Sequence, residues 1–175
     1  CGRMAPVKRF EALLGAALEA RRHLPDLRLV AVGEGPERAR LVEWVARHGA
    51  EEWVELPGQL SDEDLRERYR SAWLVASASL AEGWGLTLTE AAACGTPAVA
   101  TDVGGHRCSL VPGETGLLAP LAQLGETMAL LLKDHGQRDR MADAALRRAR
   151  TLTWDATALE ILKVFHKETA RRYSG

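Results

Sequence analysis

The chain has 175 residues, an apolar fraction of 46% and a formal net charge of −1 at pH 7, which suits one globular domain with a sizeable core. This charge excludes a general attraction to nucleic acid, and no apolar run is long enough to span a bilayer. Cys1, Cys94 and Cys108 are odd in number and lack metal-ligand spacing, so we expect a protein of the reducing cytoplasm.

The first half of the chain alternates predicted helices and strands. Apolar residues recur every three or four positions in the helical stretches, whereas the strand stretches are short, continuous apolar runs. Helices are predicted over residues 6–23, 36–49 and 61–70, and strands over residues 27–32 and 53–56. Uniformly apolar strands between helices are typical of a parallel sheet covered on both faces. We therefore predict an α/β, Rossmann-like doubly wound domain.

The second half continues this alternation and then becomes helical. Strands are predicted over residues 73–78, 98–100 and 115–118. A short alanine-rich helix after the first of them ends at Gly95, and an apolar stripe follows Pro120. Further helices are predicted over residues 137–150 and from about residue 154, the last one capped by Thr153. The last helix is expected to bury Trp154, Leu159, Leu162 and Phe165.

Glycine-containing loops follow the predicted strands, and Gly2-Arg3 is expected to follow a strand that lies upstream of Cys1. Parallel strands bring such loops to one edge, the carboxyl edge, where open α/β sheets bind ligands. Tight turns alone explain any one of these loops but explain the whole set less well. The loops comprise residues 2–3, 33–35, 57–59, 82–85 and 104–105.

The loop and helix start at residues 79–97 form the centre of the predicted site. Gly83 and Gly85 flank Trp84 and let the backbone approach a ligand, while the amides of the next helical turn point at it. Glu82 and Glu90 would then lie on either side of a phosphate bound at this helix end. Their carboxylates can accept hydrogen bonds from the hydroxyls of a sugar attached to that phosphate. Alternatively, Glu90 completes a capping box that begins at Thr87, and Glu82 is a solvated loop acid.

Two basic residues lie around the start of the first helix. The helix dipole disfavours Arg3 and Lys8 at this end, which indicates an anionic partner such as a diphosphate that both can reach. The alternative is a pair of solvated bases.

Several of these motifs together resemble the C-terminal, donor-binding domain of retaining glycosyltransferases with the GT-B fold, over nearly the whole chain. The most specific motif is the pair Glu82 and Glu90 in its glycine context, followed by Ala-Cys-Gly-Thr-Pro at residues 93–97. The other matching segments are Gly2-Arg3 with Lys8, Gly33-Glu34-Gly35-Pro36, Pro57-Gly58, Val103-Gly104-Gly105 and residues 113–118.

The resemblance implies a role for each matching residue. Arg3 and Lys8 would bind the donor diphosphate and neutralise the leaving group, Glu90 would hold the ribose, and Glu82 would contact the transferred sugar. Backbone around Gly58 and Gln59 would face the nucleobase. The remaining implied donor-binding residues are Gly33, Gly83, Trp84, Gly85, Leu86 and Thr87.

The resemblance also implies what lies outside the chain. The partner would be an N-terminal acceptor-binding domain, toward which the helix from about residue 154 is expected to pack. The expected substrate is a nucleotide-diphosphate sugar, with no cofactor or metal, and the chain alone is expected to bind nucleotide weakly and transfer nothing.

Two positions depart from the family pattern: Cys108 replaces a usual glutamate and Arg9 a usual glycine. We interpret the neighbouring His106 as a plain loop histidine.

Other interpretations stay open. A stand-alone nucleotide-sugar binding module, a sugar-nucleotide epimerase or a phosphorylase fits the same architecture, whereas a dehydrogenase lacks the third glycine after Gly33 and Gly35. The acidic residues at 62–64 resemble a metal-binding pair of carboxylates, but the helix dipole also favours acidic side chains at the start of a helix. Arginines at 147–150 and 171–172 suit either peripheral membrane contact or a solvated helix face. The sequence does not identify the base, sugar or acceptor.

Overall fold

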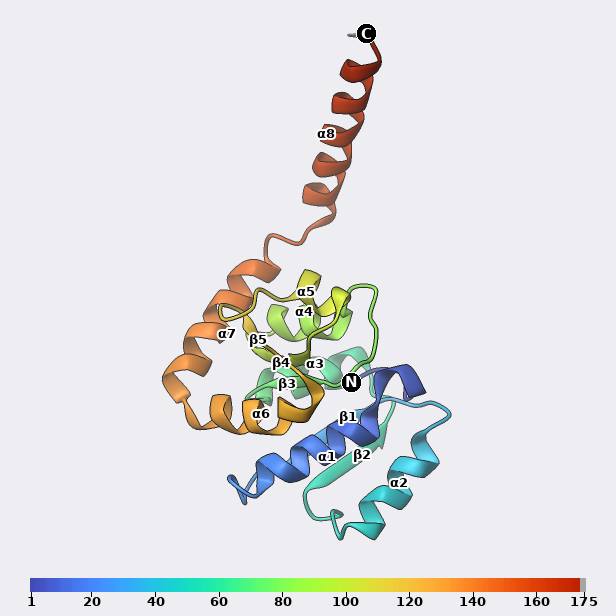
Figure 1. The fold of residues 1–175 in the computed structure, drawn as a ribbon, viewed down its shortest axis with the longest axis vertical. Helices are drawn as coiled ribbons and strands as arrows, with labels where there is room; N and C mark the ends of the chain where they lie inside the picture. Colours follow the sequence, from blue (N-terminus) through green and yellow to red (C-terminus); the bar gives the residue numbers. More distant parts are fainter. Residues whose placement is uncertain (174–175) are drawn as a thin grey trace.

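A computed structural model describes residues 1–173, in which parallel strands alternate with helices (Figure 1). The strands are β1 (Leu29–Val32), β2 (Val54–Gly58), β3 (Val75–Ser77), β4 (Ala98–Thr101) and β5 (Gly116–Ala119). The main helices are α1 (Phe10–Arg21), α2 (Arg38–Arg47), α3 (Asp62–Ser71), α4 (Leu86–Ala93), α5 (Gly104–Ser109), α6 (Leu124–Lys133), α7 (His135–Ala149) and α8 (Trp154–Tyr173). Two short 3-10 turns are η1 (Pro6–Lys8) and η2 (Leu121–Gln123). This order confirms the predicted Rossmann-like α/β class.

All the strand pairs in the described residues are parallel, but they form two hydrogen-bonded groups instead of one continuous sheet. In the β1–β2 pair, Leu29 is opposite Val54. In the β3–β4–β5 group, Ala98 of β4 is opposite Val75 on one side and Gly116 on the other. Parallel pairing brings the carboxyl ends of the strands to one edge of each group.

The first residues of the chain connect the two groups at this edge. The amide of Gly2 donates to the carbonyl of Val32, the last residue of β1, at 3.0 Å, and the amide of Met4 donates to that of Glu34, in the following loop, at 2.7 Å. Just beyond them, the amide of Leu80, after β3, donates to the carbonyl of Val7 at 2.8 Å. The segment that carries Lys8 therefore lies beside the loop that carries Glu82.

The predicted helix over residues 6–23 is wrong in one respect, because it is broken at Arg9. Pro6–Lys8 forms the 3-10 turn η1, and α1 begins only at Phe10. Arg9 has a φ of 48° and is the one non-glycine residue with positive φ among the described residues. Its Nε donates to the carbonyl of Ala78 at 2.9 Å, which compensates part of the cost of a left-handed conformation. Lys8 therefore lies on a separate turn, outside α1.

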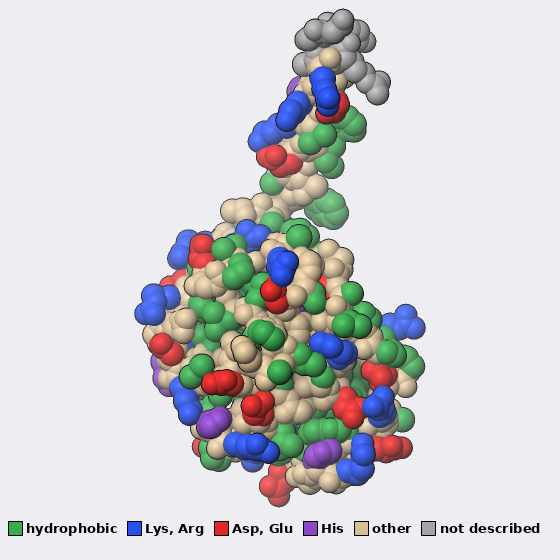
Figure 2. Space-filling view, in the orientation of Figure 1, with side chains coloured by type: hydrophobic (Ala, Val, Ile, Leu, Met, Phe, Trp, Pro, Cys, Tyr) green, Lys and Arg blue, Asp and Glu red, His purple; other side chains and the backbone are tan. Residues whose placement is uncertain are grey.

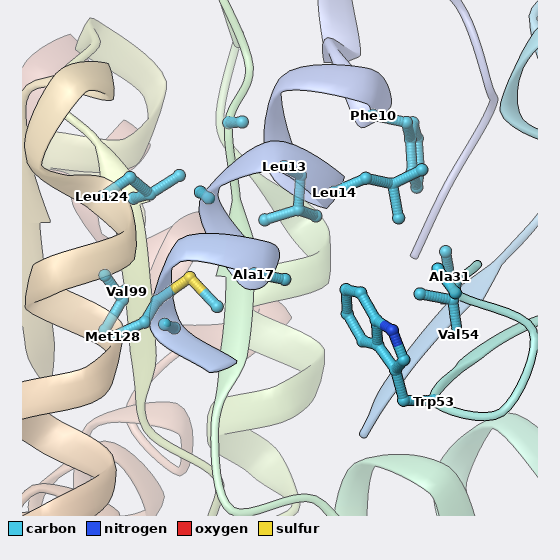
Figure 3. Close-up of a cluster of buried hydrophobic side chains, with 14 of the residues drawn as sticks. Phe10, Leu13, Leu14, Ala17, Ala31, Trp53, Val54, Val99, Leu124 and Met128 are labelled. Carbon is cyan, nitrogen blue, oxygen red and sulfur yellow. The ribbon is translucent and has the colours of Figure 1, made fainter. Parts of the chain in front are cut away.

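Helix α1 lies at the centre of the hydrophobic core. Figure 3 shows it between Trp53 and Val54, on the β1–β2 side, and Leu124 and Met128 of α6. Leu14 of α1 is 1% exposed. Apolar residues on α1 therefore connect the two groups of strands, as their helical spacing predicts.

Helix α8 extends away from the body of the molecule (Figure 1). The prediction that its apolar residues are buried is wrong for this chain. Trp154 is 88% exposed and Phe165 63%, and Figure 2 shows apolar side chains along one side of the helix and basic ones along the other. The Thr153 cap is confirmed, since its hydroxyl accepts from the amide of Ala156. No helix within the described residues is both long and apolar enough to cross a membrane.

Candidate functional site

A short ion pair joins two residues of the predicted site. The Nζ atom of Lys8 lies 2.6 Å from Oε1 of Glu82, and the two side chains are 29% and 11% exposed. The Ser79 hydroxyl donates to the same oxygen at 2.7 Å. The other carboxylate oxygen, Oε2, accepts no hydrogen bond from the described part of the chain. It is the oxygen that a ligand hydroxyl can approach.

The surroundings of Glu82 keep its carboxyl group ionised. Partial burial alone would raise the pKa of Glu82, but hydrogen bonds from Lys8 and Ser79 and the positive charges of Lys8 and His106 outweigh it. The pKa therefore lies below its ordinary value of 4.5. Glu82 can accept hydrogen bonds from a sugar without first losing a proton.

Lys8 and Glu82 line one pocket with the start of α4. Residues from the first segment, from α1, from the end of β3 and from the following loop surround it. The lining residues are Cys1, Lys8, Phe10, Leu13, Ala76, Ser77, Ala78, Ser79, Glu82 and Thr87. The pocket therefore combines a cation, an anion and a helix N-terminus, which suits a ligand that carries both phosphate and hydroxyl groups.

The start of α4 differs from the capping-box alternative. Gly85 is the N-cap, with a φ of 92°, and no side chain caps the helix. A Cβ at Gly85 would lie 3.0 Å from the Ser109 hydroxyl and 3.2 Å from the His106 ring. Thr87 is the second helical residue instead of the cap, so Glu90 does not serve a capping box. The first amides of α4 lack side-chain acceptors, and Thr87, in the first turn of α4, lines the pocket.

Helix α5 supports the Glu82 loop from behind. Residues 104–105, predicted as a loop, form its first turn. A Cβ at Gly105 would lie 2.4 Å from the backbone oxygen of Glu82, whereas one at Gly104 would meet nothing within 4 Å. The close approach of α5 to the Glu82 backbone therefore requires glycine at one position and not at its neighbour.

Glu90 is exposed and does not itself line this pocket. Its Oε2 accepts a hydrogen bond of 2.9 Å from the hydroxyl of Tyr69, which also lies 3.2 Å from Sγ of Cys1. Cys1 in turn lines the pocket together with Lys8. Through Tyr69 and Cys1, Glu90 therefore lies beside the pocket that holds Lys8 and Glu82. We call the pocket and Glu90 together the cleft.

The sequence analysis did not identify Tyr69. The available signal is that Tyr69 is the one buried residue of α3, a helix composed mainly of charged side chains. Such a lone aromatic marks the face of the helix that packs inward.

The other predicted residues differ in their contacts, and none of those named here lines the pocket. Arg3 is exposed, and its side chain forms no hydrogen bond or ion pair within the described residues. The Gly33 amide donates to the Gly58 carbonyl at 2.8 Å, so these two glycines form part of the backbone at the end of β1 and β2. Trp84 is 39% exposed, and its indole N–H donates to Thr89 at 3.2 Å. Gln59, Gly83 and Leu86 are exposed.

His106 is not the plain loop histidine of the sequence interpretation. It lies on α5, is 1% exposed, and its Nδ1 is 2.7 Å from the carbonyl of Thr101. Because a carbonyl only accepts, Nδ1 carries a proton. His106 therefore lies in the core beside the loop that carries Glu82, where its ring limits the space at Gly85.

Comparison with solved structures defines the class of protein. The pneumococcal O-GlcNAc transferase GtfA, in complex with UDP and GlcNAc, matches 97% of this chain and 35% of that chain with a TM-score of 0.80 and 26% identity. The C-terminal domain of the group 1 glycosyl transferase LpcC from Francisella tularensis matches 87% of this chain and 83% of that chain, with a TM-score of 0.77 and 25% identity. The fold is that of one half of a GT-B glycosyltransferase.

Sequence comparison then identifies the family. The model described as "Glycosyl transferases group 1" matches residues 1–148, and the chain belongs to this family. A D-inositol 3-phosphate glycosyltransferase of Salinispora tropica is 37% identical over 183 residues, which cover 97% of this chain and 38% of the relative. The chain thus spans about two fifths of the length of the curated relatives it matches.

Proposed function

We propose that the chain is the donor-binding half of a glycosyltransferase that moves a hexose from a nucleotide-diphosphate sugar to an acceptor. The transfer retains the anomeric configuration and uses no metal ion. The observation that carries this proposal is the Lys8–Glu82 pair beside the start of α4, which offers a cation for phosphate and an ionised acceptor for sugar hydroxyls in one pocket.

Each charged residue has a distinct role in this proposal. The three N–H donors of Lys8 allow it to keep Glu82 while it binds a phosphate oxygen. Arg3, whose side chain is exposed, turns toward the same diphosphate. Glu82 accepts from the transferred sugar, and Glu90 from the ribose. As the glycosidic bond breaks, an oxocarbenium-like sugar forms, and Lys8, Arg3 and the helix end stabilise the charge that develops on the leaving diphosphate.

This chain supplies only part of the required stabilisation. Two charge-assisted contacts contribute about 1.5 to 3 kcal/mol each and the helix end about 1 kcal/mol. Enzymes lower barriers by roughly 8 kcal/mol or more. The remainder is assigned to an N-terminal acceptor-binding half, against which α8 packs and which closes over the donor. The larger size of the relatives supports this arrangement.

Ligand binding by the 175-residue chain tests the first part of the proposal. Thermal shift and calorimetry against UDP-, GDP-, ADP- and TDP-linked sugars are expected to give weak binding to one base class, with UDP as the first probe because a solved relative is described with it. Binding unchanged by EDTA supports metal independence. Binding that requires a divalent cation contradicts it, and the absence of binding to every donor contradicts donor recognition.

Turnover tests the second part. The chain alone is expected to transfer no sugar. A chimera with the N-terminal half of the Salinispora tropica relative is expected to transfer, with inositol 3-phosphate as the first acceptor to try because the relative is named for it. NMR of the product then reports the anomeric configuration. An inverted product contradicts retention, and turnover by the chain alone contradicts the need for a second half.

A further inference from the structure

The buried hydroxyl of Tyr69 has a polar environment that the proposed chemistry does not yet use. Tyr69 is 5% exposed and belongs to α3, whose other residues are mainly charged. A buried phenol requires a hydrogen-bond partner. Here the partner is the carboxylate of Glu90, at 2.9 Å.

The direction of this hydrogen bond is fixed. An ionised carboxylate only accepts, so the phenol donates its single proton to Glu90. Burial first, and then the charge and hydrogen bond of Glu90, raise the pKa of Tyr69 well above its ordinary value of 10.0. Tyr69 therefore remains a neutral donor wherever the protein is folded. The Cys1 thiol, at 3.2 Å, is the weaker competing acceptor.

The backbone of Tyr69 is held against the helix that carries Glu90. The hydroxyl of Thr96, just beyond the end of α4, donates to the carbonyl of Tyr69 at 2.6 Å in a buried contact. Helices α3 and α4 also pack against each other. The phenol and the carboxylate are thus attached to elements that cannot move independently.

Glu90 itself lacks any other restraint that we find within the described residues. It is exposed, and Tyr69 is its hydrogen-bond donor. An exposed glutamate samples several rotamers, and ordering it on binding carries an entropic cost. A donor that occupies Oε2 selects one rotamer and leaves Oε1 for a ligand.

We propose that Tyr69 is a positioning residue that orients Glu90 for a vicinal diol, the ribose 2′- and 3′-hydroxyls of a nucleoside diphosphate. This inference rests on the proposed function and adds to it a residue that the chain uses to select ribonucleotides. Tyr69 does not touch the ligand; it acts through Glu90. Its loss therefore weakens binding only of ligands that present the diol.

The test compares two ligands on three variants of the 175-residue chain. The probe is whichever of UDP, GDP and ADP binds the unaltered chain most tightly, and the matched control is its 2′,3′-dideoxy counterpart. Tyr69→Phe is expected to weaken binding of the ribonucleotide about 3- to 10-fold, the range for one hydrogen bond, and to leave the dideoxy nucleotide within about twofold. Glu90→Gln is expected to reduce the same selectivity, and Tyr69→Phe added to it changes little further.

The alternative outcomes distinguish this inference from the proposed function. Equal weakening of both nucleotides by Tyr69→Phe indicates a purely structural tyrosine and overturns the inference, as does unchanged selectivity. If the unaltered chain binds none of the nucleotides, the proposed function itself fails.

A second variant keeps the test decisive if Tyr69→Phe does not fold. Glu90→Asp is one methylene shorter and cannot reach Tyr69 and the ribose together. Loss of selectivity in Glu90→Asp supports the inference, and selectivity equal to that of the unaltered chain overturns it.

Discussion

The two glutamates of the cleft are held in opposite ways. Glu82 has a side chain that is 11% exposed, and it is fixed by a cation and a hydroxyl on one oxygen. Glu90 is exposed and fixed by one neutral phenol. Under the proposed roles, the sugar side of the cleft depends on charge, whereas the ribose side depends on the orientation of a single carboxylate. Substitutions on the two sides are therefore expected to differ in magnitude and in kind.

The largest effect is expected from Lys8→Ala, which removes the charge on the Glu82 side. Loss of a charge-assisted contact is expected to weaken nucleoside diphosphate binding by about 10- to 100-fold, more than the Glu90→Gln change does. Calorimetry measures both. The matched control is Lys133→Ala, an exposed lysine at the end of α6. A Lys8→Ala effect no larger than that of Glu90→Gln would remove the distinction between the two sides.

The next largest effect is expected on stability, from a substitution at Gly105, which packs against the backbone of Glu82. Gly105→Ala forces a Cβ against the Glu82 carbonyl, at 2.4 Å in the present geometry, and is expected to destabilise the fold by about 1 to 3 kcal/mol. Gly104→Ala, the adjacent control, meets nothing within 4 Å and is expected to be nearly neutral. Urea unfolding measures both variants. Equal stabilities would contradict the close packing of α5 on the Glu82 loop.

A smaller effect is expected at Arg9, which fixes the turn that carries Lys8. Arg9→Ala and Arg9→Gly both remove the hydrogen bond to Ala78. Only the glycine relieves the left-handed backbone, so Arg9→Gly is expected to be more stable than Arg9→Ala by about 1 kcal/mol. Because both variants lose the hydrogen bond to Ala78, the difference between their urea unfolding midpoints reports only the free-energy cost of the left-handed backbone at residue 9. If alanine proves equal to or better than glycine, the break between η1 and α1 is not as described.

The smallest effect concerns pH. Because the pKa of Glu82 is lowered in the folded state, the unfolded chain binds more protons as the pH falls below the ordinary value of 4.5. The stabilisation is therefore fully present above that value and is lost as the pH falls through the lowered pKa. Urea unfolding between about pH 3 and 7 should show the unaltered chain approaching Glu82→Gln in stability at the acid end. A constant difference across this range would contradict the shift.

The sequence predicts the parts of this molecule that follow from local pattern. Apolar periodicity predicts most of α1, and continuous apolar runs predict the strands. The parallel sheet predicts that the loops after the strands meet at one edge, where Lys8 and Glu82 form an ion pair. The contact between Tyr69 and Glu90 was not predictable in this way, because it joins residues 21 positions apart and depends on how α3 packs on α4. Propensity likewise does not reveal the conformation of Arg9, which depends on the distant carbonyl of Ala78.

The last helix shows a further limit of sequence periodicity. The spacing of Trp154, Leu159, Leu162 and Phe165 predicts an amphipathic helix, and α8 has its apolar side chains along one side (Figure 2). Periodicity reports which residues can be covered, but it carries no information on whether the covering surface is present. Their exposure in this chain is therefore compatible with the pattern that suggested burial.

The same exposure has a consequence for the motions of this chain. A helix of 20 residues that packs on little else lacks the tertiary contacts that supply most of the stability of helices in proteins. Amide protons of α8 are therefore expected to exchange with deuterium far faster than those of buried β4. Any surface that covers its apolar stripe would slow this exchange and shift the fluorescence of Trp154 to shorter wavelength. Both signals can therefore be used to detect the docking of α8 on a partner surface.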